Sequence, residues 1–438
     1  MDKPLKIFPV SLGCPKNRVD FEKTLALLKN KGYEITLDPS LADVLWINTC
    51  AFIKPAVEEA IDTILELSDY KKEGSKLVVS GCLTARYGKE KLKELLPEVD
   101  EFLGIEPYSE LERFEPKERV FTENPFYAYL KISEGCAHRC SYCTIPKIRG
   151  RFRSKPLPQL VEEATYLLKL GVKELILVGQ DTTLYGKDIG EKDGLLKLLI
   201  SLSKLPFEFR IRVLYLHPQH VDENLLLNML SIPKVLPYFD LPIQHAHPKI
   251  LKRMNRNYSP EKILNLISSV RKANPRATFR STVIVGFPGE GEEEFNFLLE
   301  FLKEAEFDYL GAFPFYPEEA TPAEKLKPRV QAKERRRRRK EVLMLQQAIT
   351  KKRLEERVGS LDEVLILEEE SPNRFRGLAS FQAPEIDGLT LVKVKSTQKA
   401  TETLLPGDLV KVRITKAKVY DVEAMPLFAT QDKAMALE

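Results

Sequence analysis

Short apolar segments alternate with segments of helical spacing through residues 1–122. The apolar segments are compact and read as buried strands: Lys6–Val10, Val44–Asn48 and Leu77–Ser80. The segments Arg18–Lys31 and Val57–Ser68 carry apolar residues three or four positions apart, which predicts helices with one buried face. Strands that alternate with helices favour a parallel sheet covered by helices. We therefore expect an N-terminal, doubly wound α/β domain over residues 1–122.

The same alternation continues through residues 125–325 and repeats six times. Helical spacing is clearest at Pro158–Leu170, Pro260–Ala273 and Glu292–Ala305. The strands are expected at Ala128–Ile132, Glu174–Gly179, Arg210–Leu216, Tyr238–Pro242, Thr278–Val285 and Tyr309–Phe313. Six strand–helix units without a reversal predict a central partial (βα)6 barrel, whose active site would lie at the carboxyl ends of its strands.

A basic helical linker is expected over residues 326–359. Twelve Lys or Arg and four Asp or Glu lie between Arg329 and Arg357, and helical spacing covers residues 329–357. The run Arg335–Arg339 goes right round a helix, so its five side chains cannot all face one groove. This pattern favours a solvated face with salt bridges to acidic neighbours, and a nucleic-acid contact stays as the alternative.

Residues 360–425 change to short strands separated by tight turns. The strands are expected at Glu363–Leu367, Gly377–Phe381, Thr390–Val394 and Leu409–Ala417. Turn residues such as those at Pro406–Asp408 separate them. The pattern predicts a small antiparallel β-barrel at the C-terminus, a type of domain that binds nucleic acid or protein.

The composition of the chain indicates its cellular compartment. The N-terminus lacks the basic, apolar and small-residue order of a signal peptide. No run of about 18 apolar residues occurs, so the sequence predicts no membrane span and no membrane partner. Six cysteines in 438 residues are too few for a disulfide scaffold. We therefore expect a cytoplasmic protein with reduced thiols.

The most informative motif is a group of three cysteines with the spacing C-x3-C-x2-C. Cys136, Cys140 and Cys143 directly follow the first expected strand of the central barrel. Three thiolates on one short loop can hold three irons of a cubane iron–sulfur cluster and leave the fourth iron open for chemistry. A zinc site with His138 or a distant residue as fourth ligand, or inert thiols, are the alternatives.

The other three cysteines each follow an expected strand of the N-terminal domain. Cys14, Cys50 and Cys82 would emerge at the carboxyl ends of parallel strands, the edge where open α/β sheets bind ligands. Gly13 and Gly81 would let the backbone pass close to a bulky ligand. The alternative is that these are buried core thiols, since free cysteine is commonly buried.

The order of these features resembles the methylthiotransferase family of radical S-adenosylmethionine (SAM) enzymes over nearly the whole chain. The matching segments are Ser11–Asn17, Asn48–Ile53, Gly81–Leu83, Gly135–Arg153, Gly286–Glu290 and Ala320–Pro322. The resemblance implies that the terminal barrel is TRAM-like. It also implies two [4Fe-4S] clusters, with Cys14, Cys50 and Cys82 holding the first and Cys136, Cys140 and Cys143 the second, SAM-binding one.

The resemblance also implies a division of labour. SAM at the second cluster would give a deoxyadenosyl radical, and the first cluster would carry sulfur supplied as sulfide or polysulfide. Tyr142, Gln180, Gly286 and Gly289 resemble the positions that flank SAM. An external electron donor such as flavodoxin or ferredoxin would supply the electron that cleaves SAM.

The substrate implied is an aspartate β-carbon of small-subunit ribosomal protein S-twelve, either as the free protein or on the assembled subunit. The segment Cys140–Ser154 looks more like the RimO type that modifies this protein than the type that modifies tRNA adenosine. Residues 360–424 hold nine basic and eleven acidic residues, which suits a basic protein better than phosphates. Arg335–Arg339 keeps the tRNA enzyme as the alternative.

The sequence departs from the family pattern at two positions near the sixth expected strand. Gly291 stands where the pattern has Thr, and Ala320 stands where it has Gly. We therefore expect the sixth strand and its loop to be the least regular part of the central barrel.

Overall fold

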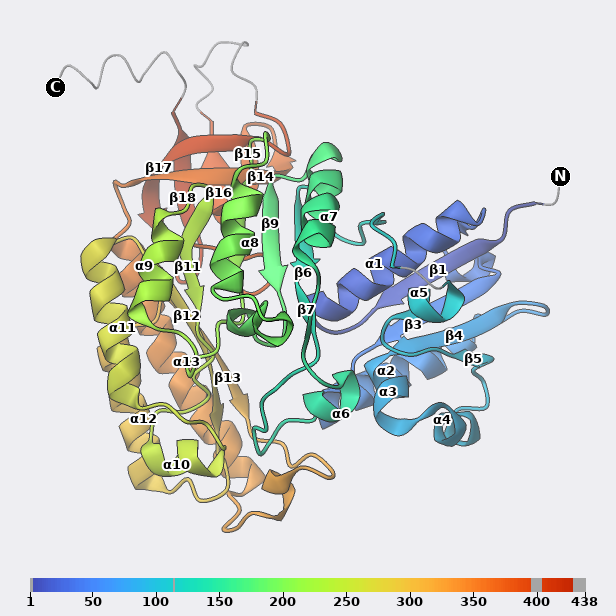
Figure 1. Ribbon diagram of the computed structural model, residues 1–438, viewed down its shortest axis with the longest axis horizontal. Coiled ribbons are helices and arrows are strands. Elements are labelled where there is room, and N and C mark those ends of the chain that lie inside the picture. The colour runs from blue at the N-terminus through green and yellow to red at the C-terminus, as the bar shows by residue number, and fades with distance from the viewer. Residues whose placement is uncertain (1–2, 113–114, 395–403, 428–438) are drawn as a thin grey trace.

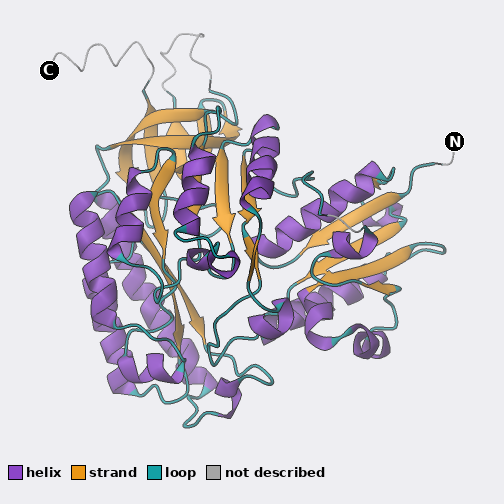
Figure 2. Cartoon of the chain, in the orientation of Figure 1, coloured by secondary structure: helices purple, strands orange, loops and turns teal. Residues whose placement is uncertain are grey.

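The computed structural model describes residues 3–112, 115–394 and 404–427. An N-terminal unit lies beside a larger central unit, and a strand-rich C-terminal unit packs against the central one (Figure 1). Helices line the outside of the central unit and strands its inside (Figure 2). The division into residues 1–122, 125–325, 326–359 and 360–425 stays a prediction, and residues 113–114 and 395–403 within it lie outside the described residues.

The N-terminal unit is a five-stranded parallel sheet with the order β2-β1-β3-β4-β5, as the alternation predicts. Its strands are β1 (Lys6–Ser11), β2 (Glu34–Ile35), β3 (Val44–Thr49), β4 (Lys76–Gly81) and β5 (Glu101–Phe102). Its helices are α1 (Pro15–Asn30), α2 (Lys54–Ser68), α3 (Cys82–Tyr87), α4 (Lys89–Leu95) and α5 (Pro107–Leu111). Sequence pattern misses β2 and β5 because two residues carry no periodicity.

The central unit is a six-stranded parallel sheet with the order β13-β12-β11-β10-β9-β6. Its strands are β6 (Tyr127–Lys131), β9 (Glu174–Val178), β10 (Arg210–Val213), β11 (Val235–Asp240), β12 (Thr278–Val285) and β13 (Tyr309–Pro314). Its helices are α6 (Ile145–Arg149), α7 (Leu157–Lys169), α8 (Gly194–Ser203), α9 (Glu223–Ser231), α10 (Pro248–Arg253), α11 (Pro260–Ala273) and α12 (Glu292–Ala305). All six expected strands form. The sixth is regular despite Ala320, whose φ of +60° places it in the left-handed region in the loop after β13.

The two faces of the central sheet pack against different partners. On one face, alternate residues such as Leu130 and Leu177 pack against the surrounding helices. On the other face, Tyr129, Ile176 and Tyr238 pack against residues of the C-terminal unit, including Leu365 and Leu378. Successive strand residues point to opposite faces. The helix-facing side of the central sheet is therefore apolar, whereas the other side combines apolar and aromatic residues with buried ion pairs such as Arg212–Glu174 and Arg280–Asp240.

The C-terminal unit is a closed five-stranded barrel with the order β14-β15-β16-β18-β17. Its strands are β14 (Leu361–Ser371), β15 (Arg374–Ala379), β16 (Thr390–Lys393), β17 (Leu409–Ala417) and β18 (Val422–Pro426). The predicted small antiparallel β-barrel forms, with one exception in its pairing: β16 and β18 run parallel. Sequence reasoning missed β18, the strand that closes the barrel.

Helix α13 (Ala332–Glu355) connects the central unit to the barrel. The predicted salt bridges form, but the run is not wholly a solvated face. Arg337 pairs with Glu334 and Glu341 on the surface, whereas Arg338 is buried and pairs with Glu290 at 2.9 Å. Four of the five arginines bond to protein groups, with Arg335 on the Phe315 carbonyl and Arg339 on the Ala312 carbonyl.

Candidate active site

The N-terminal cysteines lie at the carboxyl ends of three adjacent strands. Cys14 precedes α1 after β1, Cys50 follows β3, and Cys82 begins α3 after β4. The strand order places β3 between β1 and β4, so the topology brings these residues to one edge of the sheet. The predicted convergence of residues 36 and 32 apart in the chain therefore occurs.

Close packing holds this N-terminal triad. A Cβ on Gly13 would lie 2.9 Å from the Cβ and 3.3 Å from the Sγ of Cys50, and the φ of Gly13 is +101°. The close neighbour of this glycine is thus a cysteine of the adjacent strand. The buried Asn17 joins the same loops, since its Nδ2 donates to the carbonyls of Leu12 and Thr49 at 2.9 and 3.1 Å.

The charges of the N-terminal triad are unequal. Burial raises the pKa of Cys82 to about 12, and repulsion from Cys14 and Cys50 adds to the rise. Burial also acts to raise the pKa of Cys14, but Lys16, Arg149 and two backbone N–H groups hold it below its ordinary value. Three thiolates that interact this strongly need a cation among them. Their mutual proximity and sulfur chemistry therefore fit an iron–sulfur cluster with one open iron.

The second triad occupies one loop at the carboxyl end of β6. The strands β7 (Ser133–Glu134) and β8 (Arg153–Ser154) pair at its base, and the Cys136 N–H donates to the Gly150 carbonyl at 3.2 Å. Ser141 anchors the loop to the helix α10 region, because its N–H donates to the Met254 carbonyl at 3.0 Å. The loop lies at the active-site edge of the barrel, as predicted.

The sulfurs of this loop also suit iron. Burial raises the pKa of Cys136 to about 11 and that of Cys143 to about 12, with repulsion from Cys140 contributing to both. The Cys136 Sγ accepts from the His138 N–H at 3.4 Å, and the Cys140 Sγ accepts from Arg256 at 3.7 Å. Three converging thiols with donors aimed at the sulfurs fit the open-iron cluster that the spacing predicts.

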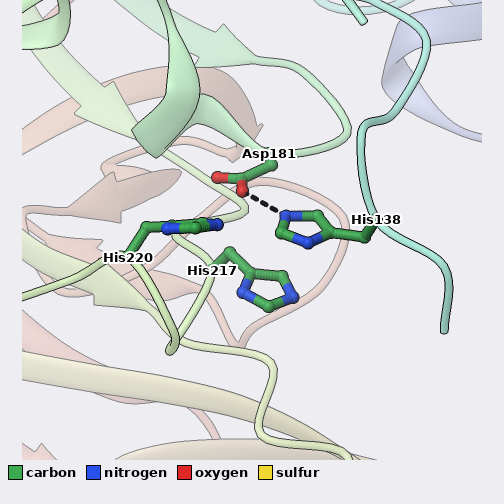
Figure 3. A group of neighbouring side chains, drawn as sticks. All are labelled: His138, Asp181, His217 and His220. Carbon is green, nitrogen blue, oxygen red and sulfur yellow. Dashed lines mark hydrogen bonds and ion pairs between the residues drawn. The ribbon is translucent and has the colours of Figure 1, made fainter. Parts of the chain in front are cut away.

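Three histidines and an aspartate gather behind this loop (Figure 3). One ligand atom from each of His138, Asp181, His217 and His220 lies within 4.8 Å of the others. His138 Nε2 hydrogen-bonds to Asp181 at 2.6 Å, and its ring stacks on that of His217 at 3.8 Å and 9°. Two parallel imidazoles cannot both direct an in-plane lone pair at one ion. The stacking therefore argues against one ion held by both His138 and His217, and the bond to Asp181 supports the loop at His138.

Three sequence families match separate parts of the chain. The Radical SAM superfamily matches residues 130–302, the family described as Uncharacterized protein family UPF0004 matches residues 6–104, and the TRAM domain matches residues 358–426. These segments correspond to the central sheet, the N-terminal sheet and the closed barrel.

Close sequence similarity to named proteins along nearly the whole chain shows the family. The ribosomal protein uS12 methylthiotransferase RimO of Syntrophomonas wolfei is 43% identical over 436 residues, covering 94% of this chain and 98% of that protein. RimO of Aquifex aeolicus is 44% identical, covering 95% of this chain and 96% of its own. The chain belongs to the RimO family. Among solved structures, the radical SAM methyltransferase TsrM of Kitasatospora setae is similar, with 15% identity, a TM-score of 0.49, and 70% of this chain and 72% of that chain covered.

The residues expected to flank SAM in this RimO-family chain have different surroundings. Tyr142 and Gln180 lie beside the loop triad: the Tyr142 hydroxyl is 3.4 Å from Arg256, and the buried Gln180 Nε2 has no hydrogen-bond partner among the described residues. Gly286 and Gly289 closely approach protein side chains instead. A Cβ on Gly286 would lie 2.1 Å from Cγ of Arg335, and one on Gly289 would lie 2.9 Å from Nε of Arg253.

Sequence reasoning missed two buried arginines, one beside each triad. Arg149 Nη2 lies 3.7 Å from Cys82 Sγ, and Arg256 Nη1 lies 3.7 Å from Cys140 Sγ. Both are distant in sequence from the sulfur that they contact. No local motif marks them, because each contact depends on how the chain folds back on itself.

A cavity of about 520 Å³ opens beside the loop triad. Cys136 and His138 form part of its lining, together with the exposed cations Arg139, Arg151 and Lys187. Asp188 is the acidic residue of the lining, and it accepts hydrogen bonds from Ser154. The approach to Cys136 is therefore basic. No helix among the described residues is both long and apolar enough to cross a bilayer.

Proposed function

We propose that this RimO-family chain adds a methylthio group to the β-carbon of an aspartate of ribosomal protein uS12. Relatives that are 40–44% identical over almost their whole length carry the name uS12 methylthiotransferase. The observation that carries the proposal is the N-terminal triad. Cys14, Cys50 and Cys82 meet at one sheet edge, which provides a place for sulfur besides the radical-generating loop.

Cys136, Cys140 and Cys143 would hold the [4Fe-4S] cluster that binds SAM. When bound, this cluster supplies the electron that cleaves SAM to a deoxyadenosyl radical. Tyr142 presents a half-buried aromatic ring within the loop, and the unpaired Nε2 of Gln180 offers a donor to a bound group. Gly286 and Gly289 shape the turn after β12 against Arg335 and Arg253, so their contribution to SAM binding is through the turn.

Cys14, Cys50 and Cys82 would hold the first [4Fe-4S] cluster, which would carry sulfur derived from sulfide or polysulfide. Cys82 is buried and Cys14 and Cys50 are half-buried at a closely packed edge of the sheet. Lys16 and Arg149 supply positive charge beside the cysteines.

An external electron donor such as flavodoxin or ferredoxin would approach through the basic cavity beside Cys136. Arg139, Arg151 and Lys187 would attract an acidic carrier. Replacing Arg139 and Arg151 by Glu should slow flavodoxin-driven SAM cleavage about tenfold at low salt. Dithionite-driven cleavage should be unchanged. Equal slowing with both reductants would contradict this route.

The charge of the barrel and the contacts of the arginine run favour a protein substrate over tRNA. The barrel region 360–424 carries two more acidic than basic residues. Four arginines of the run Arg335–Arg339 bond to protein groups, which leaves little of the run for phosphate contacts. A ribosomal substrate and thiol ligands suit the cytoplasm, where thiols stay reduced. The tRNA adenosine enzyme is not favoured.

Triad variants test this function. Anaerobic reconstitution should load about eight irons per chain, four for each cubane cluster. The triple variant Cys14→Ala, Cys50→Ala, Cys82→Ala should keep about four irons and SAM cleavage but lose methylthiolation. The triple variant of Cys136, Cys140 and Cys143 should lose both activities. Loss of SAM cleavage from the first variant with its iron intact would contradict the division of labour.

Mass spectrometry identifies the substrate. The uS12 peptide that contains the target aspartate should gain a methylthio group when incubated with the reconstituted enzyme, SAM, sulfide and a reductant. Isolated tRNA treated in the same way should stay unmodified. Modification of tRNA adenosine with an unmodified uS12 peptide would reverse the assignment.

A further inference from the structure

Arg149 lies between the two cysteine triads. It is the last residue of α6, and its side chain is 1% exposed. Through one nitrogen it contacts residues near the loop triad, and through another it contacts the N-terminal triad. Among the described residues, Arg149 is the charged side chain that joins the two sites by direct hydrogen bonds.

Nη1 of Arg149 faces the loop triad. It donates to both carboxylate oxygens of Glu134 at 3.0 Å and lies 3.4 Å from Asp20. Glu134 comes two residues before Cys136, so this contact fixes the start of the loop. The ammonium group of Lys131 bonds to the same two carboxylates and to Glu106. That ammonium occupies the centre of the acidic group, which therefore offers no cation site.

Nη2 of Arg149 faces the N-terminal triad. It donates to Asn17 Oδ1 at 3.3 Å and to Cys82 Sγ at 3.7 Å. Nε is buried and has no hydrogen-bond partner among the described residues. Nε and Nη2 share one edge of the planar guanidinium, whose donors have a fixed fork geometry. The edge toward Cys82 therefore carries a further unpaired N–H.

A permanent cation against a cluster sulfur has a defined electrostatic effect. Arginine stays protonated at every accessible pH, and the buried setting strengthens its field. Reduction adds negative charge to an iron–sulfur cluster, and hydrogen bonds to its sulfurs stabilise that charge and set the reduction potential. Burying such a cation without partners is costly, and here Glu134 and Asp20 compensate it.

We propose that Arg149 is a positioning residue that donates through its Nε/Nη2 edge to Cys82 and the sulfur shell of the N-terminal cluster. It thereby raises the reduction potential of that cluster, while Nη1 pairs with Glu134 and Asp20. The proposal rests on the proposed function, since it requires a cluster on Cys14, Cys50 and Cys82.

The test isolates the N-terminal cluster in the full-length chain. The triple variant Cys136→Ala, Cys140→Ala, Cys143→Ala is reconstituted alone, with Arg149→Lys, and with Arg149→Gln. Iron content and the midpoint potential from EPR-monitored titration are measured. We expect about four irons in each protein and a potential that shifts to more negative values, most in Arg149→Gln and less in Arg149→Lys, which keeps the charge.

With both triads intact, Arg149→Lys should lower methylthiolation about tenfold, as is usual for partners of metal ligands, while SAM cleavage is retained. Arg86→Gln is the matched control. Arg86 lies on α3, the helix that begins at Cys82, and its side chain is 9% exposed. It pairs across the domain boundary with Glu318 at 2.8 Å, but it has no hydrogen bond to a cysteine among the described residues. Its loss should leave the potential unchanged.

Two failures are distinguishable. A parent triple variant that binds no iron would overturn the proposed function, because the N-terminal triad would then hold no cluster. Four irons with an unchanged potential in Arg149→Lys and Arg149→Gln would overturn the role of Arg149 alone. An equal shift in Arg86→Gln would also overturn it, since any broken domain contact would then have the same effect.

Discussion

Cys14, Cys50 and Cys82 are separated by 36 and 32 positions in the chain, whereas Cys136, Cys140 and Cys143 fall within eight residues. The first triad is assembled by three adjacent parallel strands, and the second by one loop. Each has one buried arginine on one of its sulfurs. The sheet triad depends on how strands pack, while the loop triad depends mainly on local chain geometry and on what supports the loop. Perturbations should therefore separate the two.

The largest separation is expected from Gly13→Ala. The added methyl group would lie 2.9 Å from Cβ of Cys50, at a φ of +101° that disfavours any side chain. The sheet triad should lose its cluster, so that iron content falls from about eight to about four per chain, while SAM cleavage continues. Iron analysis and a SAM cleavage assay measure this. Ala137→Ser on the exposed part of the loop is the control, and full iron in Gly13→Ala would refute the dependence on strand packing.

The next effect concerns a buried ion-pair group that joins α1 of the N-terminal unit to α7 of the central unit. Glu163 of α7 accepts from Lys23 of α1 at 2.8 Å and from Arg119 at 2.6 Å, and all three are buried. Glu163→Gln removes the shared carboxylate, although Lys23 keeps Glu115 and Arg119 keeps Glu22 as partners. The loss of charged hydrogen bonds should cost about 1.5–3 kcal/mol. Hydrogen exchange of α1 amides measures the loss. Exchange as slow as in the parent protein would show that α1 is held by other contacts.

The same carboxyl gives the contact a pH dependence. Burial acts to raise the pKa of Glu163, but Lys23 and Arg119 outweigh it and hold the pKa at about 2. Because the pKa is depressed in the folded state, the stabilisation is present above the unfolded value of about 4.5. It is lost as the pH falls through about 2. In Glu163→Gln, α1 exchange should lack this component between pH 4.5 and 2.

A smaller effect is expected from removing the support of the loop triad. Asp181→Ala removes the partner of His138 and should speed chelator-driven iron loss from the loop about tenfold. Iron on the sheet triad should be retained. Asp222→Ala is the control, since Asp222 caps α9 after the next strand without touching the loop. Equal iron loss from both variants would mean that helix stability, not the histidine contact, holds the iron.

The smallest expected effect is an increase in the stability of the folded protein. Ala320 has a φ of +60°, and its carbonyl accepts from Lys147 of α6 at 2.7 Å, beside the loop triad. Ala320→Gly relieves the left-handed strain at a cost in chain entropy, for a net gain of about 0.5–1 kcal/mol. A rise in the thermal midpoint with unchanged SAM cleavage is expected. A fall in the midpoint would show that the entropy term dominates.

Both triads could be predicted because cysteines at strand ends are visible in sequence once the strands are placed. The six central strands were predicted from short segments rich in apolar residues, such as Glu174–Val178, although Arg210, Arg212 and Arg280 interrupt two of them. The contacts of Arg149 with Cys82, Arg256 with Cys140 and Asp181 with His138 were not, because each joins residues 43 to 116 positions apart by folding rather than by periodicity. The parallel pairing of β16 and β18 was missed since strand spacing identifies a strand, not its neighbour.

The C-terminal barrel packs against one face of the central sheet, with Leu365 and Leu378 against Tyr129, Ile176 and Tyr238. The barrel is thus part of the core on which the catalytic strands rest, besides any role in recognising uS12. A different barrel domain could not simply replace this one to change the substrate, because the new barrel would first have to pack against the same face of the central sheet. A shortened chain that ends after β13 should accordingly expose an aromatic surface and self-associate before its affinity for uS12 could be measured.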